Sequence, residues 1–192
     1  MVYKVAVLMG SPNDGDKMAP ATATLERYGI EADVRVMSAH RSPALVAGFV
    51  SGAREAGYSA IICGAGMAAH LAGAAAAHTT LPVIGVPLSG GAINGWDSLL
   101  ATVQMPKGIP VATVAVDGAM NAALLAVQML AVGDPDLVEA LEVHREEMVP
   151  RCAAAPRTPW RTSSPPAMPA GPWSASGQRR PRWSWNASSG SP

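Results

Sequence analysis

Five short apolar runs alternate with stretches of helical periodicity through the first 133 residues, and this alternation constrains the fold more than any other feature. Strands that are separated by helices pair as a parallel sheet with helices on both faces. The third run is apolar nearly throughout, as expected for a strand buried on both faces. The sequence therefore predicts an α/β fold with a parallel five-stranded sheet. The predicted strands are Tyr3–Met9, Glu31–Met37, Ser59–Cys63, Pro82–Val86 and Ile109–Val116.

The predicted helices are delimited by glycine, proline and capping residues. Gly29 and Gly57 follow the first two helices, at a position where a left-handed residue commonly closes a helix. Pro20 falls within the first helix, where it either moves the helix start or costs one backbone hydrogen bond. A last, acidic helix begins at Asp134, an N-cap residue followed by proline, and ends near Val149. The first predicted helix follows the loop over residues 10–15 and ends at about Tyr28. The helices between it and the last one are Pro43–Ala56, Ala72–His78, Trp96–Met105 and Gly118–Val132.

The composition changes after Pro150. The last 42 residues contain eight Pro, eight Ser, six Arg and four of the five Trp, but no acidic residue and no periodicity. Such a composition is typical of disordered segments. This basic segment could bind an anionic partner, or it could be sequence without a function, and we favour the second interpretation. We therefore expect residues 1–150 to form one folded domain and residues 151–192 to form a non-functional, disordered tail.

The formal net charge of zero conceals an asymmetry between these two parts. Residues 1–150 carry all 14 acidic residues but only 8 of the 14 Lys and Arg, which gives them a net charge of −6. An acidic body without a clustered basic face argues against nucleic acid as the target. No apolar run approaches the roughly 20 residues that a membrane helix needs, and the chain starts in a strand-like run rather than a signal peptide. We therefore expect a cytoplasmic protein, in which Cys63 and Cys152 are reduced thiols.

Three predicted strand-to-helix loops carry polar side chains that a core does not need. In the first loop, Ser11 and Asn13 offer neutral donors and Asp14 offers a carboxylate. Hydroxyls and helix N-terminal N–H groups suit a phosphate, and a carboxylate suits the hydroxyls of a sugar. The same three residues could instead serve only as turn and cap residues.

The second and third loops add two histidines and an arginine. His40 can exchange a proton near neutrality, and Arg41 carries a forked, permanently charged donor set for phosphate or carboxylate. The third loop contributes His70 and the N–H groups of residues 64–67, a possible anion-binding nest. Because adjacent parallel strands would bring the three loops to one edge of the sheet, they predict one site. Its chemistry would be imidazole acid/base catalysis on a small, phosphorylated and hydroxylated substrate.

Short motifs in these loops, together with others along the chain, cover about residues 3–149. They are Met9-Gly10-Ser11 with Asp14, Ser38-Ala39-His40-Arg41 with Pro43, Gly64-Ala65-Gly66 with Ala68-Ala69-His70-Leu71, Gly85-Val86-Pro87, Asp97-Ser98-Leu99 with Gln104-Met105-Pro106, Gly108-Ile109-Pro110-Val111 and Asn121-Ala122-Ala123-Leu124-Leu125-Ala126. As a set they resemble the class I N5-carboxyaminoimidazole ribonucleotide mutases, the phosphoribosylaminoimidazole carboxylase catalytic subunit family of purine biosynthesis.

The resemblance implies a flavodoxin-like three-layer αβα sandwich that assembles as a homo-octamer, with active sites at the subunit contacts. It implies a nucleotide substrate and no metal or organic cofactor. In the implied isomerase reaction, the N5-carboxylate of the substrate leaves as CO2, and ring carbon C4 of aminoimidazole ribonucleotide recaptures it. The product is 4-carboxyaminoimidazole ribonucleotide.

The resemblance also implies roles for single residues. His40 would be the general acid/base that protonates the departing carbamate side and later removes the C4 proton. Arg41 and Ser38 would bind phosphate. The first loop would contact the ribose phosphate, and the third loop would form the wall that traps CO2. The residues concerned are Ser11, Asn13 and Asp14 in the first loop, and Gly64, Ala65, Gly66, Ala68, His70 and Leu71 in the third.

Some positions depart from the family pattern. Asn13 stands where the family usually has Ser, Met67 where it usually has Gly, and Ala72 where it usually has Pro. The turn over residues 116–119 is also shorter than in many relatives. Two alternative functions compete with this one. A class II aminoimidazole ribonucleotide carboxylase would use free CO2 on the same fold, but that class has Lys where Arg41 stands. A flavodoxin-like nucleotide-binding module would lack catalysis.

Overall fold

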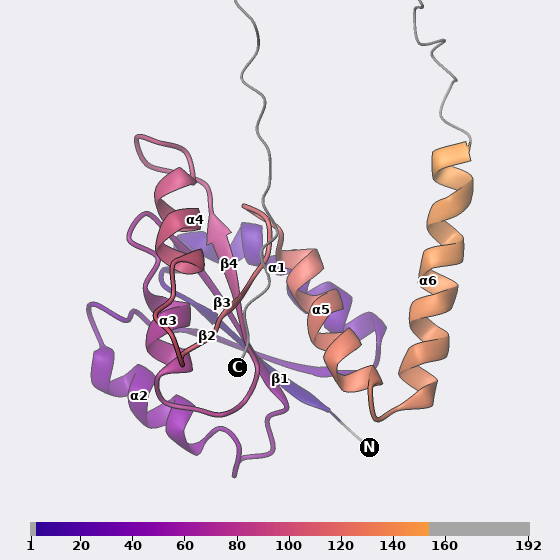
Figure 1. Ribbon diagram of the computed structural model, residues 1–192, viewed down its shortest axis with the longest axis horizontal. Helices are drawn as coiled ribbons and strands as arrows, with labels where there is room; N and C mark the ends of the chain where they lie inside the picture. The colour runs from indigo at the N-terminus through magenta and orange to yellow at the C-terminus, as the bar shows by residue number, and fades with distance from the viewer. Residues whose placement is uncertain (1–2, 154–192) are drawn as a thin grey trace, which may run out of the picture. The chain divides into compact units, whose positions relative to one another are not determined.

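The computed structural model describes residues 3–153, which form the predicted α/β fold (Figure 1). The strands are β1 (Lys4–Met9), β2 (Glu31–Val36), β3 (Ala60–Gly66), β4 (Val83–Leu88) and β5 (Ala112–Thr113). All neighbouring strands pair in parallel, and their order in the sheet is β2-β1-β3-β4-β5. This is the strand order of flavodoxin-like folds, so the predicted sheet and the implied architecture are both confirmed.

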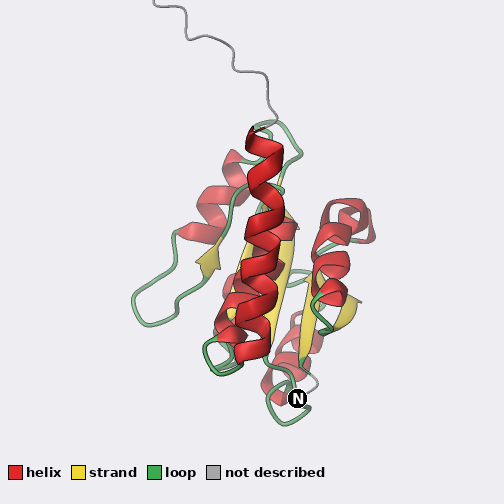
Figure 2. Cartoon of the chain, turned by 90° about the vertical axis from the view of Figure 1, so that its right-hand side faces the viewer, coloured by secondary structure: helices red, strands yellow, loops and turns green. Residues whose placement is uncertain are grey.

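Helices cover both faces of the sheet, which gives three layers (Figures 1 and 2). They are η1 (Pro12–Asp14, a 3-10 turn), α1 (Gly15–Arg27), α2 (Pro43–Gly52), α3 (Leu71–Ala76), α4 (Trp96–Val103), α5 (Ala119–Ala131) and α6 (Pro135–Ala153). α1 and α5 bury Met18 and Ala123 in the core on one face, and α2 and α3 bury Val46 and Ala75 on the other. Among residues 3–153, no helix is long and apolar enough to cross a membrane.

The acidic last helix α6 packs at its start and runs beyond its predicted end near Val149. Leu137 is only 7% exposed and belongs to the core cluster that α1 and α5 share. Farther along, the guanidinium of Arg27 at the end of α1 donates to the carboxylate of Glu147 at 2.5 Å. The predicted disordered tail, residues 151–192, lies outside the described residues from position 154 onward.

The strands differ in length from the prediction. The predicted fifth strand, Ile109–Val116, is reduced to the two residues of β5 because only these pair with β4. Pro110 has no N–H to give to the ladder, which prevents regular pairing before this point. β3 and β4 instead continue past their predicted ends at Cys63 and Val86. Pro87 pairs with Ala65 of β3 inside β4, and its carbonyl points to the other side, where it accepts from the N–H of Asp117. Because the nitrogen and carbonyl of one strand residue face the same side, the missing N–H lies where β5 has already ended.

The glycines and prolines of the first two helices behave largely as predicted. Pro20 lies inside α1, so the helix keeps its start and loses the one hydrogen bond that an N–H would give to the carbonyl of Asp16. Gly29 and Gly57 have φ angles of +68° and +82°, the left-handed conformation that ends a helix. α2 ends at Gly52, before the predicted end at Ala56, and residues 53–56 form turns instead.

A methyl group at Gly85 is expected to destabilise the core. An added Cβ would lie 2.4 Å from Cγ2 of Thr102 and 3.0 Å from Cγ1 of Val111, and β-branched side chains have little freedom to move away. Overpacking of this kind typically costs about 1–3 kcal/mol. Gly85→Ala should therefore lower the free energy of unfolding by that order in urea denaturation. Gly48→Ala in α2 is the control, because nothing lies within 4 Å of its Cβ position. Helix propensity predicts a gain of about 0.5–1 kcal/mol there, and equal effects of both variants would contradict this account.

Candidate active site

The loops after β1, β2 and β3 meet at one edge of the sheet, as predicted. β1 lies between the other two strands, and Met9 at its end pairs with both Val36 and Gly64. A cavity of about 570 Å³ opens between the loops, where the strand order reverses and ligands commonly bind in such sheets. Of the predicted site residues, those that line it are Ser11, Asn13, Asp14, Ser38, His40, Arg41, Ala65, Gly66, Ala68, His70 and Leu71.

The first loop folds as a helix cap and lines the cavity at the same time. The N–H of Ser11 donates to Oδ2 of Asp14 at 2.9 Å, and the N–H of Asn13 donates to Oγ of Ser11 at 3.3 Å. This reciprocal pair is a capping box for η1. Burial raises the pKa of Asp14 above its ordinary value, although the Ser11 N–H and the charges of Lys17 and Arg41 act in the opposite direction. The capping and binding interpretations of these residues are thus compatible.

The second loop is held by Ser38 and connected to the first loop by Arg41. Oγ of Ser38 accepts from the N–H of Arg41 at 3.2 Å, and its carbonyl accepts from the N–H of Ser42 at 2.9 Å. Pro43 then begins α2 at the first helical position. The guanidinium of Arg41 donates to the carbonyl of Gly10 at 2.8 Å, which positions its fork beside the cavity. The rest of the fork can donate to an anion.

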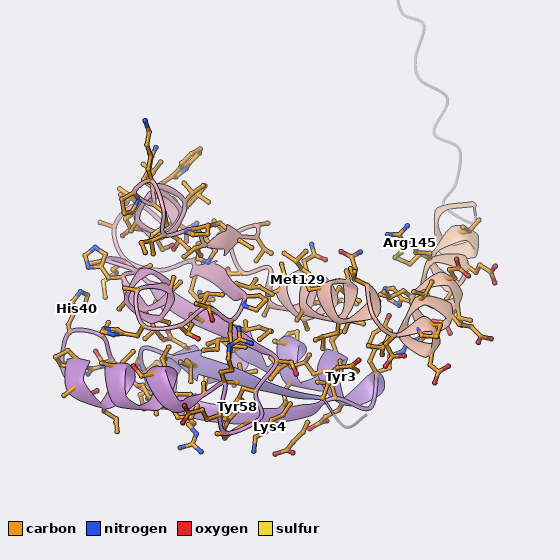
Figure 3. The ribbon with its side chains drawn as sticks, turned by 60° about the horizontal axis from the view of Figure 1, so that its bottom comes forward. Tyr3, Lys4, His40, Tyr58, Met129 and Arg145 are labelled. Carbon is orange, nitrogen blue, oxygen red and sulfur yellow. The ribbon has the colours of Figure 1, made fainter. Side chains whose placement is uncertain are left out.

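His40 and His70 are hydrogen-bonded to each other, a contact that the sequence did not reveal. Nε2 of His40 lies 2.8 Å from Nδ1 of His70, and the two ring planes meet at 76°. One ring must donate and the other accept, so the bond requires at least one nitrogen without a proton. Figure 3 shows His40 at the end of the molecule far from Tyr3, which precedes β1. Since both histidines line the cavity, their hydrogen bond brings two proton-transfer groups together there.

Gly64 is the predicted site residue that does not line the cavity. It lies within β3, where its carbonyl accepts from the N–H of Gly10 at 3.1 Å. An added Cβ at Gly64 would lie 2.4 Å from Sδ of Met18 in α1. The lack of a side chain at Gly64 therefore allows α1 to pack closely against β3. This packing explains the glycine without any ligand.

Met67 occupies a left-handed position at the mouth of the cavity. Its φ is +51°, a conformation that glycine adopts more easily than methionine, and its side chain is 62% exposed. It lines the cavity, as do Gly10 and Ala39, which also lie outside the predicted set. Met67 thus puts a flexible apolar side chain where the resemblance leads one to expect glycine.

A fourth loop, after β4, completes the cavity and was missing from the predicted site residues. Ser89, Gly90 and Gly91 line the same cavity as the first three loops. The signal in the sequence was the unusual length and glycine content of residues 87–95, since long loops in compact domains are usually functional. The sequence thus indicated a functional loop, but not that this loop lines the same cavity as the other three.

The described residues offer neither a reactive thiol nor a metal-binding cluster at the cavity. Cys63, in β3 next to Gly64, is 2% exposed, and burial raises the pKa of its thiol to about 12, so it is no nucleophile. Within residues 3–153, no group of three or more His, Cys, Asp or Glu side chains is placed to hold a metal ion.

Comparison with known proteins gives one consistent result. Residues 4–150 match the model of the AIR carboxylase family. The chain is 50% identical over 145 residues to the N5-carboxyaminoimidazole ribonucleotide mutase of Pyrococcus abyssi, which covers 76% of this chain and 83% of that protein. The mutase of Mycobacterium tuberculosis is 50% identical over 151 residues, or 79% of this chain and 87% of that protein. Among solved structures, Treponema denticola PurE superposes with a TM-score of 0.70 at 25% identity, covering 78% of this chain and 94% of that one.

Proposed function

This chain belongs to the AIR carboxylase family, and we propose that it is an N5-carboxyaminoimidazole ribonucleotide mutase, an isomerase of purine biosynthesis. It would convert N5-carboxyaminoimidazole ribonucleotide to 4-carboxyaminoimidazole ribonucleotide. The observation that carries the proposal is the hydrogen bond between Nε2 of His40 and Nδ1 of His70, 2.8 Å long, in a cavity that Arg41 also lines. Relatives that are about half identical over most of their length and bear the mutase name favour this reaction over the carboxylase and the binding module.

In the proposed reaction, His40 moves a proton in each direction. It first protonates N5 as the bond from N5 to the carboxylate carbon breaks, which releases CO2 and leaves aminoimidazole ribonucleotide. Carbon C4 then attacks the retained CO2, and His40 removes the C4 proton to restore the aromatic ring. The bond with His70 orients the imidazole for both transfers. A positioned acid/base of this kind contributes roughly 10²- to 10⁴-fold in rate.

The small side chains of the third loop suit the retention of CO2. Ala65, Gly66 and Ala68 line the cavity beside the buried Leu71, which is 2% exposed. A surface without strong donors binds little water, and CO2 held against C4 reacts as if the step were intramolecular.

We place the substrate phosphate between the first two loops. Arg41 supplies the charge, and the hydroxyls of Ser11 and Ser38 can still donate while accepting their backbone hydrogen bonds. Asp14 then faces the ribose hydroxyls, with Asn13 as a further neutral donor. The phosphate charges also keep the substrate from crossing a membrane unaided, and for this reason we place the activity in the cytoplasm.

The functional unit is proposed to be a homo-octamer with the sites at its subunit contacts. In support, α4 and the loop before it expose apolar side chains at helical spacing: Ile93 is 55% exposed, Trp96 67%, Leu100 51% and Val103 50%. Such a stripe is typical of a protein interface. Light scattering is expected to give about eight times the mass of one chain, and Leu100→Glu should lower that mass. A wild type that stays monomeric at micromolar concentration would contradict the assembly.

The reaction is tested by interconversion of the two carboxylated ribonucleotides with purified protein, without ATP and in the presence of a chelator. Turnover in both directions, followed by the absorbance of the 4-carboxy product, is the expected result. If turnover instead requires added bicarbonate and aminoimidazole ribonucleotide, the protein is a carboxylase. Tight binding of the product without any turnover would identify a binding module.

Residues 1–150 are proposed to carry the whole activity, and residues 151–192 to contribute none. A chain truncated after Ala153, where α6 ends, should retain the kcat, KM and assembly mass of the full chain. A loss of assembly or activity on truncation would show that the removed residues have a function.

A further inference from the structure

The cavity wall that follows β4 is a loop that needs restraint to keep one shape. Residues 89–95 form no helix or strand. Gly90, Gly91 and Gly95 have φ angles of +138°, +67° and +97°, and Asn94 has a φ of +47°. Glycine loses more conformational entropy on ordering than any other residue. A loop of this composition therefore holds a defined wall only if other parts of the fold fix it.

Two charged residues from distant parts of the chain hold the first residue of this loop. Nζ of Lys17, in α1, donates to both the carbonyl oxygen and Oγ of Ser89 at 2.6 Å. The carboxylate of Asp117, in the turn before α5, accepts from the N–H of Ser89 at 2.9 Å and from its hydroxyl at 2.5 Å. Lys17 and Asp117 are themselves an ion pair at 3.6 Å. All polar groups of Ser89 are thus engaged, and we call this trio the Ser89 clamp.

The turn that carries Asp117 is shaped for this contact. Asp117 has a φ of +56°, a strained conformation that aspartate tolerates better than most residues. Its own N–H donates to the carbonyl of Pro87 in β4 at 2.9 Å, which fixes the turn to the strand. Although burial alone would raise it, the hydrogen bonds from Ser89 and the charge of Lys17 hold the pKa of Asp117 below its ordinary value. The carboxylate therefore stays charged in the clamp.

The clamp acts on the part of the loop that faces the cavity. The two ends of the loop are held separately, because the buried hydroxyl of Ser98 donates to the carbonyl of Leu88, just before the loop, and to that of Gly95, its last residue, at 2.8 and 3.0 Å. Ser89 and Gly91, by contrast, line the cavity. Without the clamp, residues 89–91 would remain tethered at the two ends of the loop but lose their fixed position at the cavity.

We propose that Lys17 and Asp117 are positioning residues that set the affinity of the cavity for its substrate by ordering residues 89–91 as its fourth wall. The identity of the substrate rests on the proposed function. Neither residue lines the cavity, so neither touches the reacting atoms. Loss of the clamp should consequently raise KM and Kd but leave kcat, which depends on His40, nearly unchanged.

The test uses Lys17→Met in the full chain, with Lys17→Arg as the conservative variant and Lys4→Met as the matched control. Lys4 also forms an exposed ion pair, at 2.9 Å to Glu31, but it lies at the start of β1 and far from His40 (Figure 3). Asp117→Asn removes the charge while keeping a residue that tolerates positive φ. Three quantities are measured: steady-state kinetics, Kd for 4-carboxyaminoimidazole ribonucleotide by calorimetry, and hydrogen exchange of peptides covering residues 86–95.

Lys17→Met and Asp117→Asn are each expected to raise KM and Kd about 10-fold, as the loss of one or two charge-assisted hydrogen bonds predicts. kcat should stay within about 2-fold, and exchange in residues 86–95 should become faster. Their double variant should raise Kd by less than the product of the single effects, since both act on one clamp. Lys17→Arg should restore affinity, and Lys4→Met should change neither Kd nor exchange.

Faster exchange with an unchanged Kd would overturn the proposal, because the order of the loop would then not set affinity. Unchanged exchange in both clamp variants would overturn it as well. If the wild type binds the ribonucleotide but does not turn it over, the proposed reaction fails while the shifts in Kd still test the clamp. If the wild type does not bind the ribonucleotide, the affinity proposal fails together with the proposed function.

Discussion

Replacing His40 with Asn is expected to lower kcat for the interconversion by at least about 10²-fold, and up to about 10⁴-fold, because the variant loses the proposed general acid/base. The Asn amide matches the Nδ1 end of the imidazole and does not extend to the position of Nε2, so the bond to Nδ1 of His70 is lost, while the hydrogen bonds of Ser38 still hold the loop. The amide does not titrate near neutrality and cannot move the proton at N5 or at C4. Kd for 4-carboxyaminoimidazole ribonucleotide should stay within about 3-fold, since the phosphate contacts are intact.

His78→Asn is the matched control for this variant. His78 follows α3 and lies outside the cavity, beside Arg54 and Thr80 in a separate hollow. It should keep the kcat of the wild type. Substantial turnover by His40→Asn would contradict the assignment, and the same loss in both variants would indicate a general effect on the fold rather than on proton transfer.

Replacing Arg41 with Lys is expected to raise Kd and KM about 10- to 100-fold with a smaller effect on kcat. Lysine keeps the charge but not the planar fork, so it cannot donate to the carbonyl of Gly10 and to a phosphate with the same geometry. A charge-assisted hydrogen bond lost at a phosphate costs on the order of 1.5–3 kcal/mol, which corresponds to this range. The measurement is Kd by calorimetry together with initial rates.

Arg54→Lys is the control for Arg41→Lys. Like Arg41, Arg54 donates from its guanidinium to an uncharged oxygen, Oγ1 of Thr80 at 3.0 Å. It should leave Kd unchanged. An Arg41→Lys variant with the affinity of the wild type would exclude Arg41 as the phosphate ligand. A fall in kcat without a change in Kd would instead assign Arg41 to the chemical step.

Much of the fold followed from the sequence because its signals are local. Alternating apolar residues and helical periodicity predicted all five strands and the helices between them, and the two glycines that close the first helices were identified by position. The fifth strand was overestimated, since an apolar run does not reveal whether its backbone has a partner. The continuation of β3 and β4 into glycine- and proline-bearing segments also depends on the neighbouring strand rather than on local preference.

The candidate site was predicted in its residues more fully than in its contacts. The three polar loops could be placed at one edge because parallel strands end on the same side of a sheet. Gly64 was included because its motif resembled a binding loop, whereas its place against Met18 explains the glycine by packing. Met67 was noted as a departure from the family pattern, but its left-handed backbone is known only from the structure.

The sequence by itself determined the α/β class, the sheet and the loops that carry His40, Arg41 and His70, because repeating patterns and short motifs are properties of neighbouring residues. Only the tertiary structure decided that His40 bonds to His70 across 30 positions, and that Lys17 reaches Ser89 across 72. Such contacts depend on the packing of whole elements and on the rotamer of each side chain, and no local pattern encodes either. For this reason the fourth wall of the cavity and its clamp became visible only in the folded chain.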